Sequence, residues 1–163
     1  MKLPTPRFEH KIVRREDLAT RVNDLALPIV FTNGVFDILH RGHVTYLAQA
    51  RALGASLVVA VNSDASVRLL DKGDDRPVNP QGDRVAMLAA LESVTLVTLF
   101  DERVPATPLE IVRPEIFVKG GDYDLGAIPE VKLVETWGGK AISIEFDHDR
   151  STTSLLARLR GQI

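Results

Sequence analysis

Residues 32–43 read Thr-Asn-Gly-Val-Phe-Asp-Ile-Leu-His-Arg-Gly-His, and this stretch decides how the rest of the chain is interpreted. An apolar run at residues 28–32 leads into it, and a segment with helical spacing follows it. Gly34 permits a tight turn between the two. The sequence therefore predicts a strand, a short loop and a helix N-terminus, an arrangement that binds ligands in α/β sheets.

Five short apolar runs rich in β-branched residues predict strands. Their hydrophobicity is nearly continuous, as in strands that are covered on both faces. The predicted strands span residues 28–32, 57–62, 95–100, 116–119 and 141–144. Because segments with helical spacing separate these runs, the sequence predicts a single-domain α/β fold with a doubly wound parallel sheet of about five strands.

Two of the intervening segments carry helix signals. Val44, Leu47, Ala48 and Leu53 form one apolar stripe, and Gly54 follows as a stop signal. In the second segment, we expect Asn79 to cap a helix that begins at Pro80 and buries Val85, Leu88 and Leu91. The polar stretch before this helix, residues 71–81, contains glycine and proline and is predicted to be a mobile loop.

Length and composition limit the class of protein. The 163 residues fit one domain, which we predict to comprise an N-terminal leader at residues 1–27, with a helix near residues 15–25, and a main domain at residues 28–163. A net charge of −2 gives no general attraction to nucleic acid or to an anionic membrane. The chain has no cysteine, no signal-peptide pattern and no apolar run of membrane-spanning length, so we expect a cytoplasmic protein without disulfides.

His40 and His43 are the strongest candidates for chemistry. Three residues apart at a helix start, the two imidazoles lie on one side and can donate to neighbouring phosphate oxygens, beside the free amides near Gly42. In nucleotidyl transfer a protein can act by positioning and by neutralising charge, without a nucleophile of its own. A bare pair at this spacing can also be coincidental or serve packing or capping. A zinc site is disfavoured, because no third histidine or cysteine follows at recognisable spacing.

Taken together, residues 32–43 resemble the HxGH signature of the nucleotidyltransferase superfamily, which includes cytidylyltransferases and pantetheine-phosphate adenylyltransferase. The longer string FTNGVFDILHRGHVTYLAQARALGA, residues 31–55, is similar to the subgroup that contains heptose-phosphate adenylyltransferases and glycerol-phosphate cytidylyltransferase. Further strings resemble the heptose enzymes: VNSD at 61–64, RPVNP at 76–80, VKGGDYD at 118–124, GGK at 138–140 and RSTTSLLARLR at 150–160.

The resemblance implies a Rossmann-like nucleotidyltransferase fold and a specific reaction. ATP and D-glycero-β-D-manno-heptose 1-phosphate would give ADP-heptose and pyrophosphate, with Mg²⁺, for lipopolysaccharide core precursors. It also implies a homo-oligomer that binds these small molecules. The net charge and the absence of clustered basic and aromatic residues argue against nucleic acid or a membrane as a partner. Since 163 residues leave no room for a kinase, a separate heptose kinase would act in the same pathway.

Roles follow by resemblance for individual residues. His40 and His43 would be catalytic, Asp37 would orient the sugar phosphate or a metal-bound water, and Arg76 would bind substrate. No set of metal ligands from the protein is predicted. The predicted nucleotide-binding residues are Thr32, Asn33, Gly34, Phe36, Gly42, Asn62, Lys119, Gly120, Asp122, Arg150, Ser151, Thr152 and Thr153.

Structural interpretations compete with several of these roles. Arg76 can be a solvated loop residue, Lys119 can extend out of the sheet to solvent, and Asn62 can cap a turn. Two other functions also compete: a cytidylyltransferase acting on glycerol 3-phosphate or a related alcohol phosphate, and a nucleotide-binding regulator without turnover. The VKGGDYD and RPVNP strings favour the heptose enzyme over the first. The intact histidine pair argues against the second, because a binder needs no transition-state contacts.

Overall fold

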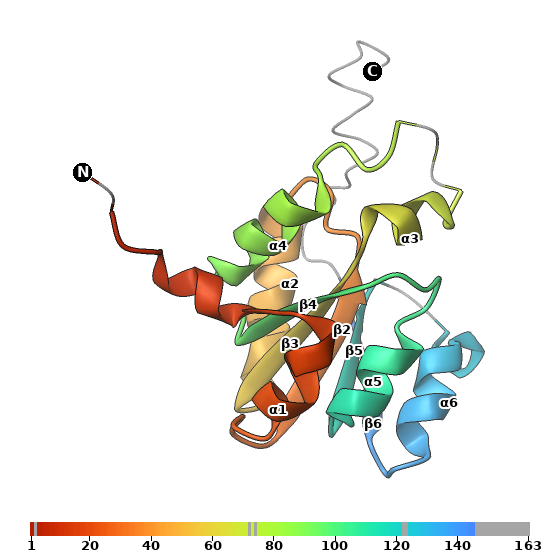
Figure 1. Ribbon diagram of the computed structural model, residues 1–163. Coiled ribbons are helices and arrows are strands. Elements are labelled where there is room, and N and C mark those ends of the chain that lie inside the picture. The colour runs from red at the N-terminus through yellow and green to blue at the C-terminus, as the bar shows by residue number, and fades with distance from the viewer. Residues whose placement is uncertain (2, 72, 74, 122–123, 146–163) are drawn as a thin grey trace.

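A computed structural model of the chain describes residues 1, 3–71, 73, 75–121 and 124–145 (Figure 1). Six parallel strands form one sheet in the order β1-β4-β3-β2-β5-β6. The strands are β1 (Ile12–Val13), β2 (Ile29–Gly34), β3 (Ser56–Asn62), β4 (Leu96–Phe100), β5 (Ile116–Gly120) and β6 (Lys140–Ile144). The prediction of a doubly wound parallel α/β fold is confirmed.

The five predicted strands are present, with ends that differ by no more than two residues. The sixth, β1, lies in the predicted leader and pairs with β4 through Ile12 opposite Val97 and Val13 opposite Thr98. A two-residue strand is too short to produce a hydrophobic run, so the sequence pattern did not reveal it.

Helices cover both faces of the sheet. They are α1 (Leu18–Val22), α2 (Arg41–Ala52), α3 (Asp64–Arg68), α4 (Gln81–Ala89), α5 (Ala106–Val112) and α6 (Pro129–Glu135), with 3₁₀ turns η1 (Arg7–Lys11), η2 (Arg15–Asp17) and η3 (Leu125–Ala127). One face of the sheet packs against α2 and α4, and the other against α1, α5 and α6. None of the helices in the described ranges is long and apolar enough to cross a membrane.

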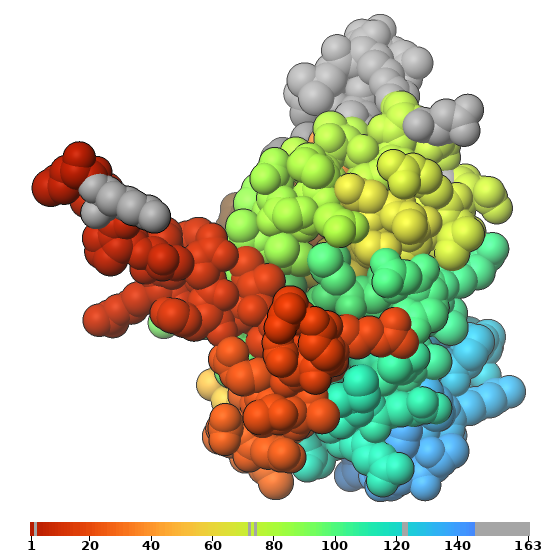
Figure 2. Space-filling view, viewed as in Figure 1, coloured from red at the N-terminus to blue at the C-terminus, as the bar shows by residue number. Residues whose placement is uncertain are grey.

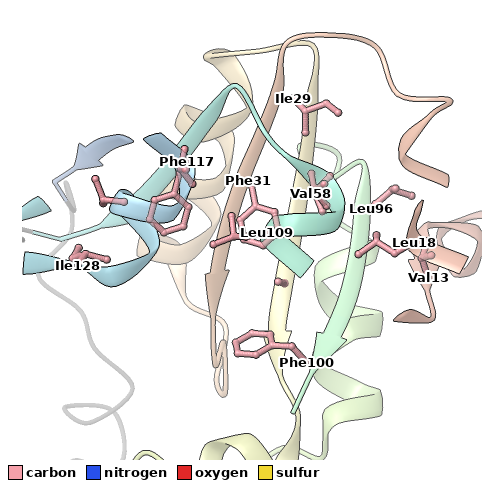
Figure 3. Packing of buried hydrophobic residues seen from close by; sticks show 14 residues of the cluster. Val13, Leu18, Ile29, Phe31, Val58, Leu96, Phe100, Leu109, Phe117 and Ile128 are labelled. Carbon is pink, nitrogen blue, oxygen red and sulfur yellow. The ribbon is translucent and has the colours of Figure 1, made fainter. Parts of the chain in front are cut away.

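Neighbouring residues of each strand contribute to different cores, because strand side chains alternate between faces. Phe31 joins the cluster beneath α5, where its ring lies 6.3 Å from that of Phe117 (Figure 3). Val30, one residue earlier, joins the cluster that includes Leu47 of α2 and Leu88 of α4. The sheet is therefore buried on both sides, which explains the continuous apolar runs.

The predicted stripe on α2 is right only at Leu47, which is fully buried. Val44 is 43% exposed and Leu53 37% exposed, and Tyr46 and Ala50 pack inward instead. Tyr46 fixes this orientation, because its hydroxyl lies 2.6 Å from Thr32 Oγ1 and donates to the Val118 carbonyl at 3.1 Å. Apolar spacing alone did not separate the correct face from one that is rotated about the helix axis.

The predicted cap of the next helix is also wrong. Pro80 occupies the N-cap position of α4, which begins at Gln81, and no side chain caps this end. The Asn79 side chain donates instead to the main-chain carbonyl of Asp37. Asn79 therefore ties α4 to the loop after β2.

The strand order places a ligand-binding crevice at β2. The next strand in sequence, β3, lies on one side of β2, whereas β5 lies on the other. Such a reversal opens a crevice beyond the carboxyl ends of the strands. The loop at residues 35–40 leaves β2 at this point and leads into α2.

Candidate active site

A cleft of about 300 Å³ lies at the reversal point. Residues from the carboxyl ends of β2, β3 and β5 meet there with side chains from α2, α6 and the loops that follow β2, α3 and β4. The lining residues are Asn33, Gly34, Val35, Phe36, His43, Tyr46, Asn62, Leu70, Arg103, Lys119, Gly120 and Glu130. In the space-filling view, the chain segment before η1 stands away from the body that contains this cleft (Figure 2).

His40 and His43 form a stacked pair at the start of α2. Their ring centroids are 3.8 Å apart and their planes meet at 25°. His43 lines the cleft, and no described residue forms a hydrogen bond with its buried Nδ1. The spacing of three residues thus brings the two imidazoles together, as the sequence predicted.

The N-terminus of α2 is open to an anion. His40 occupies the N-cap without a side-chain hydrogen bond to the helix, and the first turn contains no acidic residue. The first hydrogen bond along the helix runs from the Val44 amide to the His40 carbonyl at 3.3 Å. The preceding amides of Arg41, Gly42 and His43 have no acceptor within the helix, and the helix dipole favours negative charge beside them.

Burial, aided by the neighbouring charge of His40, lowers the pKa of His43 from 6.5 to about 4, and the Ile38 backbone acts in the opposite direction. The imidazole of His43 is consequently neutral at pH 7 in the free protein and has one N–H to donate.

Phe36 packs against His43, and its own backbone has a strained conformation. Its φ angle is 48°, a left-handed value that costs roughly 1–3 kcal/mol in a residue with a bulky side chain. The Phe36 ring meets the His43 ring edge-on at 5.3 Å. A Cβ on Gly34 would lie 3.0 Å from this ring, so glycine at position 34 leaves room for it.

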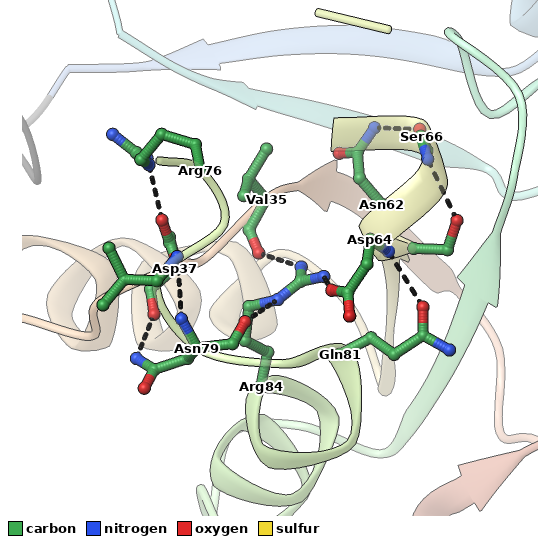
Figure 4. A network of polar contacts seen from close by, with 11 residues as sticks. Val35, Asp37, Asn62, Asp64, Ser66, Arg76, Asn79, Gln81 and Arg84 are labelled. Atoms are coloured by element: carbon green, nitrogen blue, oxygen red, sulfur yellow. Dashed lines mark hydrogen bonds and ion pairs between the residues drawn. The ribbon is translucent and has the colours of Figure 1, made fainter. Parts of the chain in front are cut away.

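A fully buried arginine, Arg84 of α4, ties this loop to its neighbours (Figure 4). Its guanidinium donates to the Val35 carbonyl at 2.7 Å, to the Asn79 carbonyl at 3.0 Å and to Asp64 Oδ1 at 2.8 Å. Gln81 reinforces the same junction by accepting from the Asp64 amide at 2.8 Å. Arg84 therefore fixes the position of the residue just before the strained Phe36.

Asp37, the residue just after Phe36, is held in place by its own hydrogen bonds. Its carboxylate accepts from Arg76 Nε at 2.5 Å and from the amides of Val78 and Asn79 at 2.8 and 2.9 Å (Figure 4). Asp37 is 1% exposed and Arg76 is 10% exposed. Both predicted substrate-binding residues thus have protein partners, and their described contacts hold the loop rather than face the cleft.

A second cluster of charges lies across the cleft from the histidines. Lys119 at the end of β5 donates to Asn33 Oδ1 at 3.3 Å and lies 3.6 Å from Glu130 Oε1 of α6. Glu130 is only 6% exposed, and Lys119 also lies 5.9 Å from the centre of the Phe117 ring. This wall therefore presents an ammonium group and a carboxylate to the same cavity.

Comparison with known proteins agrees with this geometry. The family described as Cytidylyltransferase-like matches residues 31–154, most of the chain. The chain belongs to the cytidylyltransferase-like family. It is 56% identical over 160 residues to a D-beta-D-heptose 1-phosphate adenylyltransferase of Bordetella bronchiseptica, with 97% of this chain and 99% of that protein covered.

Longer relatives match this cytidylyltransferase-like chain over part of their length. The bifunctional protein HldE of Hahella chejuensis is 51% identical over 132 residues, which cover 81% of this chain and 28% of that protein. Among solved structures, a lipopolysaccharide core biosynthesis protein of Thermoplasma volcanium has 29% identity and a TM-score of 0.60, covering 75% of this chain and 98% of that one. A pantoate-beta-alanine ligase of Francisella tularensis, with 17% identity and a TM-score of 0.61, covers 87% of this chain and 68% of that one and shares the fold.

Most of the predicted site residues lie in the described part of this cytidylyltransferase-like fold, but not all reach the cleft. Thr32 is fully buried below it against Tyr46, and Gly42 is buried in the first turn of α2. The position of Thr32 does not support a direct nucleotide contact by its side chain, whereas Gly42 presents only its backbone amide. Asp122, Arg150, Ser151, Thr152 and Thr153 lie outside the described residues. The predicted residues that line the cleft are Asn33, Gly34, Phe36, His43, Asn62, Lys119 and Gly120.

Sequence reasoning missed Arg84 and Glu130, and it assigned no role to Arg103. Arg84 lies within a helical pattern, where an arginine is ordinarily exposed, and Glu130 follows Pro129 in an ordinary helix start. Arg103 comes soon after a predicted strand end, a position that gave a usable but weak signal. Burial and cleft contact depend on tertiary packing, so residue type alone did not identify these three.

No described group of three or more His, Asp or Glu side chains has the arrangement of a metal site. Two described carboxylates near the cleft belong to Asp37, which accepts three hydrogen bonds, and to Glu130, which is paired with Lys119. These two carboxylates already have protein partners, so the cleft suits Mg²⁺ that arrives with a nucleotide. This ion keeps several waters and binds mainly through phosphates and one or two carboxylates.

Proposed function

We propose that the chain transfers AMP from ATP to D-glycero-β-D-manno-heptose 1-phosphate and releases pyrophosphate. The observation that carries this proposal is the match to the Bordetella adenylyltransferase, which extends over nearly the full length of both chains. The product would be ADP-heptose, a precursor of the lipopolysaccharide core.

The geometry of the cleft suits this reaction. A phosphate oxygen of the acceptor attacks the α-phosphorus of ATP, and the bond between the α-phosphorus and the bridging oxygen breaks as pyrophosphate leaves. Negative charge shifts onto oxygens that the N-terminus of α2 and the His43 N–H can reach together. The acceptor phosphate is the nucleophile, so the protein needs only to position both substrates and stabilise charge.

The pKa of His43 is lowered in the free protein, and we expect it to be higher in the complex with ATP. A triphosphate beside the ring favours the protonated imidazole, so ATP binding should raise the pKa of His43 and take up a proton. The cation formed in this way opposes the charge that develops on the phosphate oxygens. Mg²⁺ supplies further charge neutralisation when it enters with ATP.

We expect a separate kinase to supply the sugar phosphate. The chain spans about a third or less of each bifunctional HldE relative, so it corresponds to only one part of those proteins. Cytoplasmic location, expected from the sequence pattern, and homo-oligomeric assembly, implied by the family resemblance, are likewise proposals.

Pyrophosphate release from the purified protein tests the function. ATP and CTP are each combined with heptose 1-phosphate and with glycerol 3-phosphate, in the presence of Mg²⁺. We expect ATP with heptose 1-phosphate to react far faster than the other three pairs. Preference for CTP with glycerol 3-phosphate would support the cytidylyltransferase alternative, and ATP binding without turnover on any pair would support a regulator.

A further inference from the structure

Glu130 is a buried carboxylate for which the reaction as described has no use. It lies in the first turn of α6, is 6% exposed and lines the cleft. Within the described part of the chain, its polar partner is Lys119, whose Nζ is 3.6 Å from Oε1. That separation is an ion pair but exceeds hydrogen-bond length. The carboxylate therefore keeps its capacity to accept hydrogen bonds from a molecule in the cleft.

The charged side chains of the cleft differ between the two sides of β2: Arg103 lies on one side, and the Lys119–Glu130 pair lies on the other. Arg103 follows β4, and Glu130 follows β5, whereas the sheet order places β4 and β5 on opposite sides of β2. The open end of α2, where the histidines lie, is attached to β2 itself. A carboxylate repels phosphate groups, so the place beside Glu130 suits an uncharged and polar part of a substrate, whereas the neighbouring Lys119 suits a phosphate.

We propose that Glu130 determines substrate specificity by accepting hydrogen bonds from sugar hydroxyl groups. A carboxylate has two oxygens and can accept from two adjacent hydroxyls. Lys119, held beside it by Asn33, is then placed to meet the phosphate attached to that sugar. The inference rests on the proposed function, which supplies two candidate sugars: the ribose of ATP and the heptose of the acceptor.

The test compares Glu130→Gln with Glu135→Gln, an exposed glutamate of the same helix. Binding of ATP and of heptose 1-phosphate is measured by calorimetry, and kcat and KM are measured for each substrate. We expect Glu130→Gln to weaken binding of one substrate by about tenfold or more, because a site built for a hydroxyl discriminates strongly. The kcat should change by less than about threefold, and Glu135→Gln should match the parent protein in every measurement.

Analogues that lack single hydroxyls identify the sugar. The analogues are 2′-deoxy-ATP, 3′-deoxy-ATP and deoxy forms of heptose 1-phosphate. For the analogue that lacks the hydroxyl bound by Glu130, the parent protein and Glu130→Gln should have equal affinity. If Glu130 acts only by holding Lys119, the loss of affinity will persist with every analogue, and the inference is overturned. Unchanged binding of both substrates by a folded Glu130→Gln protein would also overturn it. Lack of turnover in the parent protein would instead refute the proposed function.

Discussion

At the scale of single residues, the site depends on where neutral and charged groups are buried. His43 is neutral because burial lowers its pKa, and it lies between the His40 ring and the edge of Phe36. Glu130 is 6% exposed and lies 3.6 Å from Lys119 at the same cleft. The histidine pair was predictable from its spacing after a strand. The burial of Glu130 was not, because it depends on how α6 packs against β5 and β6.

The pKa of His43 predicts a specific pH dependence of stability. Between pH 6.5 and pH 4 the unfolded chain binds a proton at this residue and the folded chain resists it, so the free energy of unfolding falls as the pH falls through that window. A shift from 6.5 to about 4 corresponds to at most about 3 kcal/mol. Between pH 7 and pH 4, we expect the free energy of unfolding of the parent protein to fall by up to this amount more than that of His43→Gln.

Urea unfolding across this pH range measures the difference. Comparison with the variant removes the contributions of other titrating groups. Parallel curves for the two proteins would show that the imidazole of His43 titrates normally in the folded state.

At the scale of elements, the junction of the loop after β2 with α4 determines the geometry of the site. Arg84 holds Val35, and Asp37 holds residues 76–79, so the strained Phe36 is fixed on both sides. The strands were predictable because burial on both faces produces continuous apolar runs. This junction was not, since its hydrogen bonds join residues about 40 to 50 positions apart whose side chains ordinarily face solvent.

Asp37→Asn tests the junction. The substitution removes the negative charge that accepts from Arg76 and from two backbone amides, and leaves the largely buried Arg76 without its anionic partner. Breaking a buried ion pair of this kind costs about 3 kcal/mol or more. We expect that loss in urea unfolding and faster proteolytic cleavage within residues 75–80. Asp83→Asn, an exposed position in α4, should change stability by less than about 1 kcal/mol. Similar stability of the two variants would contradict the role assigned to Asp37.

At the scale of the whole molecule, the fold supplies a crevice and a helix N-terminus, and the ligand brings most of the charge. The net charge is −2, and no described cluster of side chains forms a metal site. The order of strands and helices allowed the position of the cleft to be predicted from sequence. Neither the strand β1 nor the helix face that α2 buries was predictable, because a two-residue strand and a rotated apolar stripe leave no distinct pattern.

Chelation should therefore separate stability from activity. With excess EDTA, we expect the melting temperature of the ligand-free protein to stay unchanged, because the described fold has no metal cluster to lose. Turnover should fall by about a hundredfold or more, since the metal contributes several kcal/mol of charge stabilisation. A lower melting temperature in EDTA would reveal a structural metal, and full turnover in EDTA would contradict the need for Mg²⁺.

The central claim is that the stacked histidines at the start of α2 stabilise the transition state of nucleotidyl transfer, and His43→Ala tests it most directly. Melting temperature, ATP affinity and turnover are measured on one preparation, with His10→Ala, an exposed histidine, as the control. We predict that His43→Ala folds and binds ATP within about tenfold of the parent protein, or roughly 1.4 kcal/mol. Its rate of pyrophosphate release should fall by about two orders of magnitude or more, as on loss of one preorganised donor. A variant that is less stable but fully active per folded molecule would make His43 a packing residue and contradict the account.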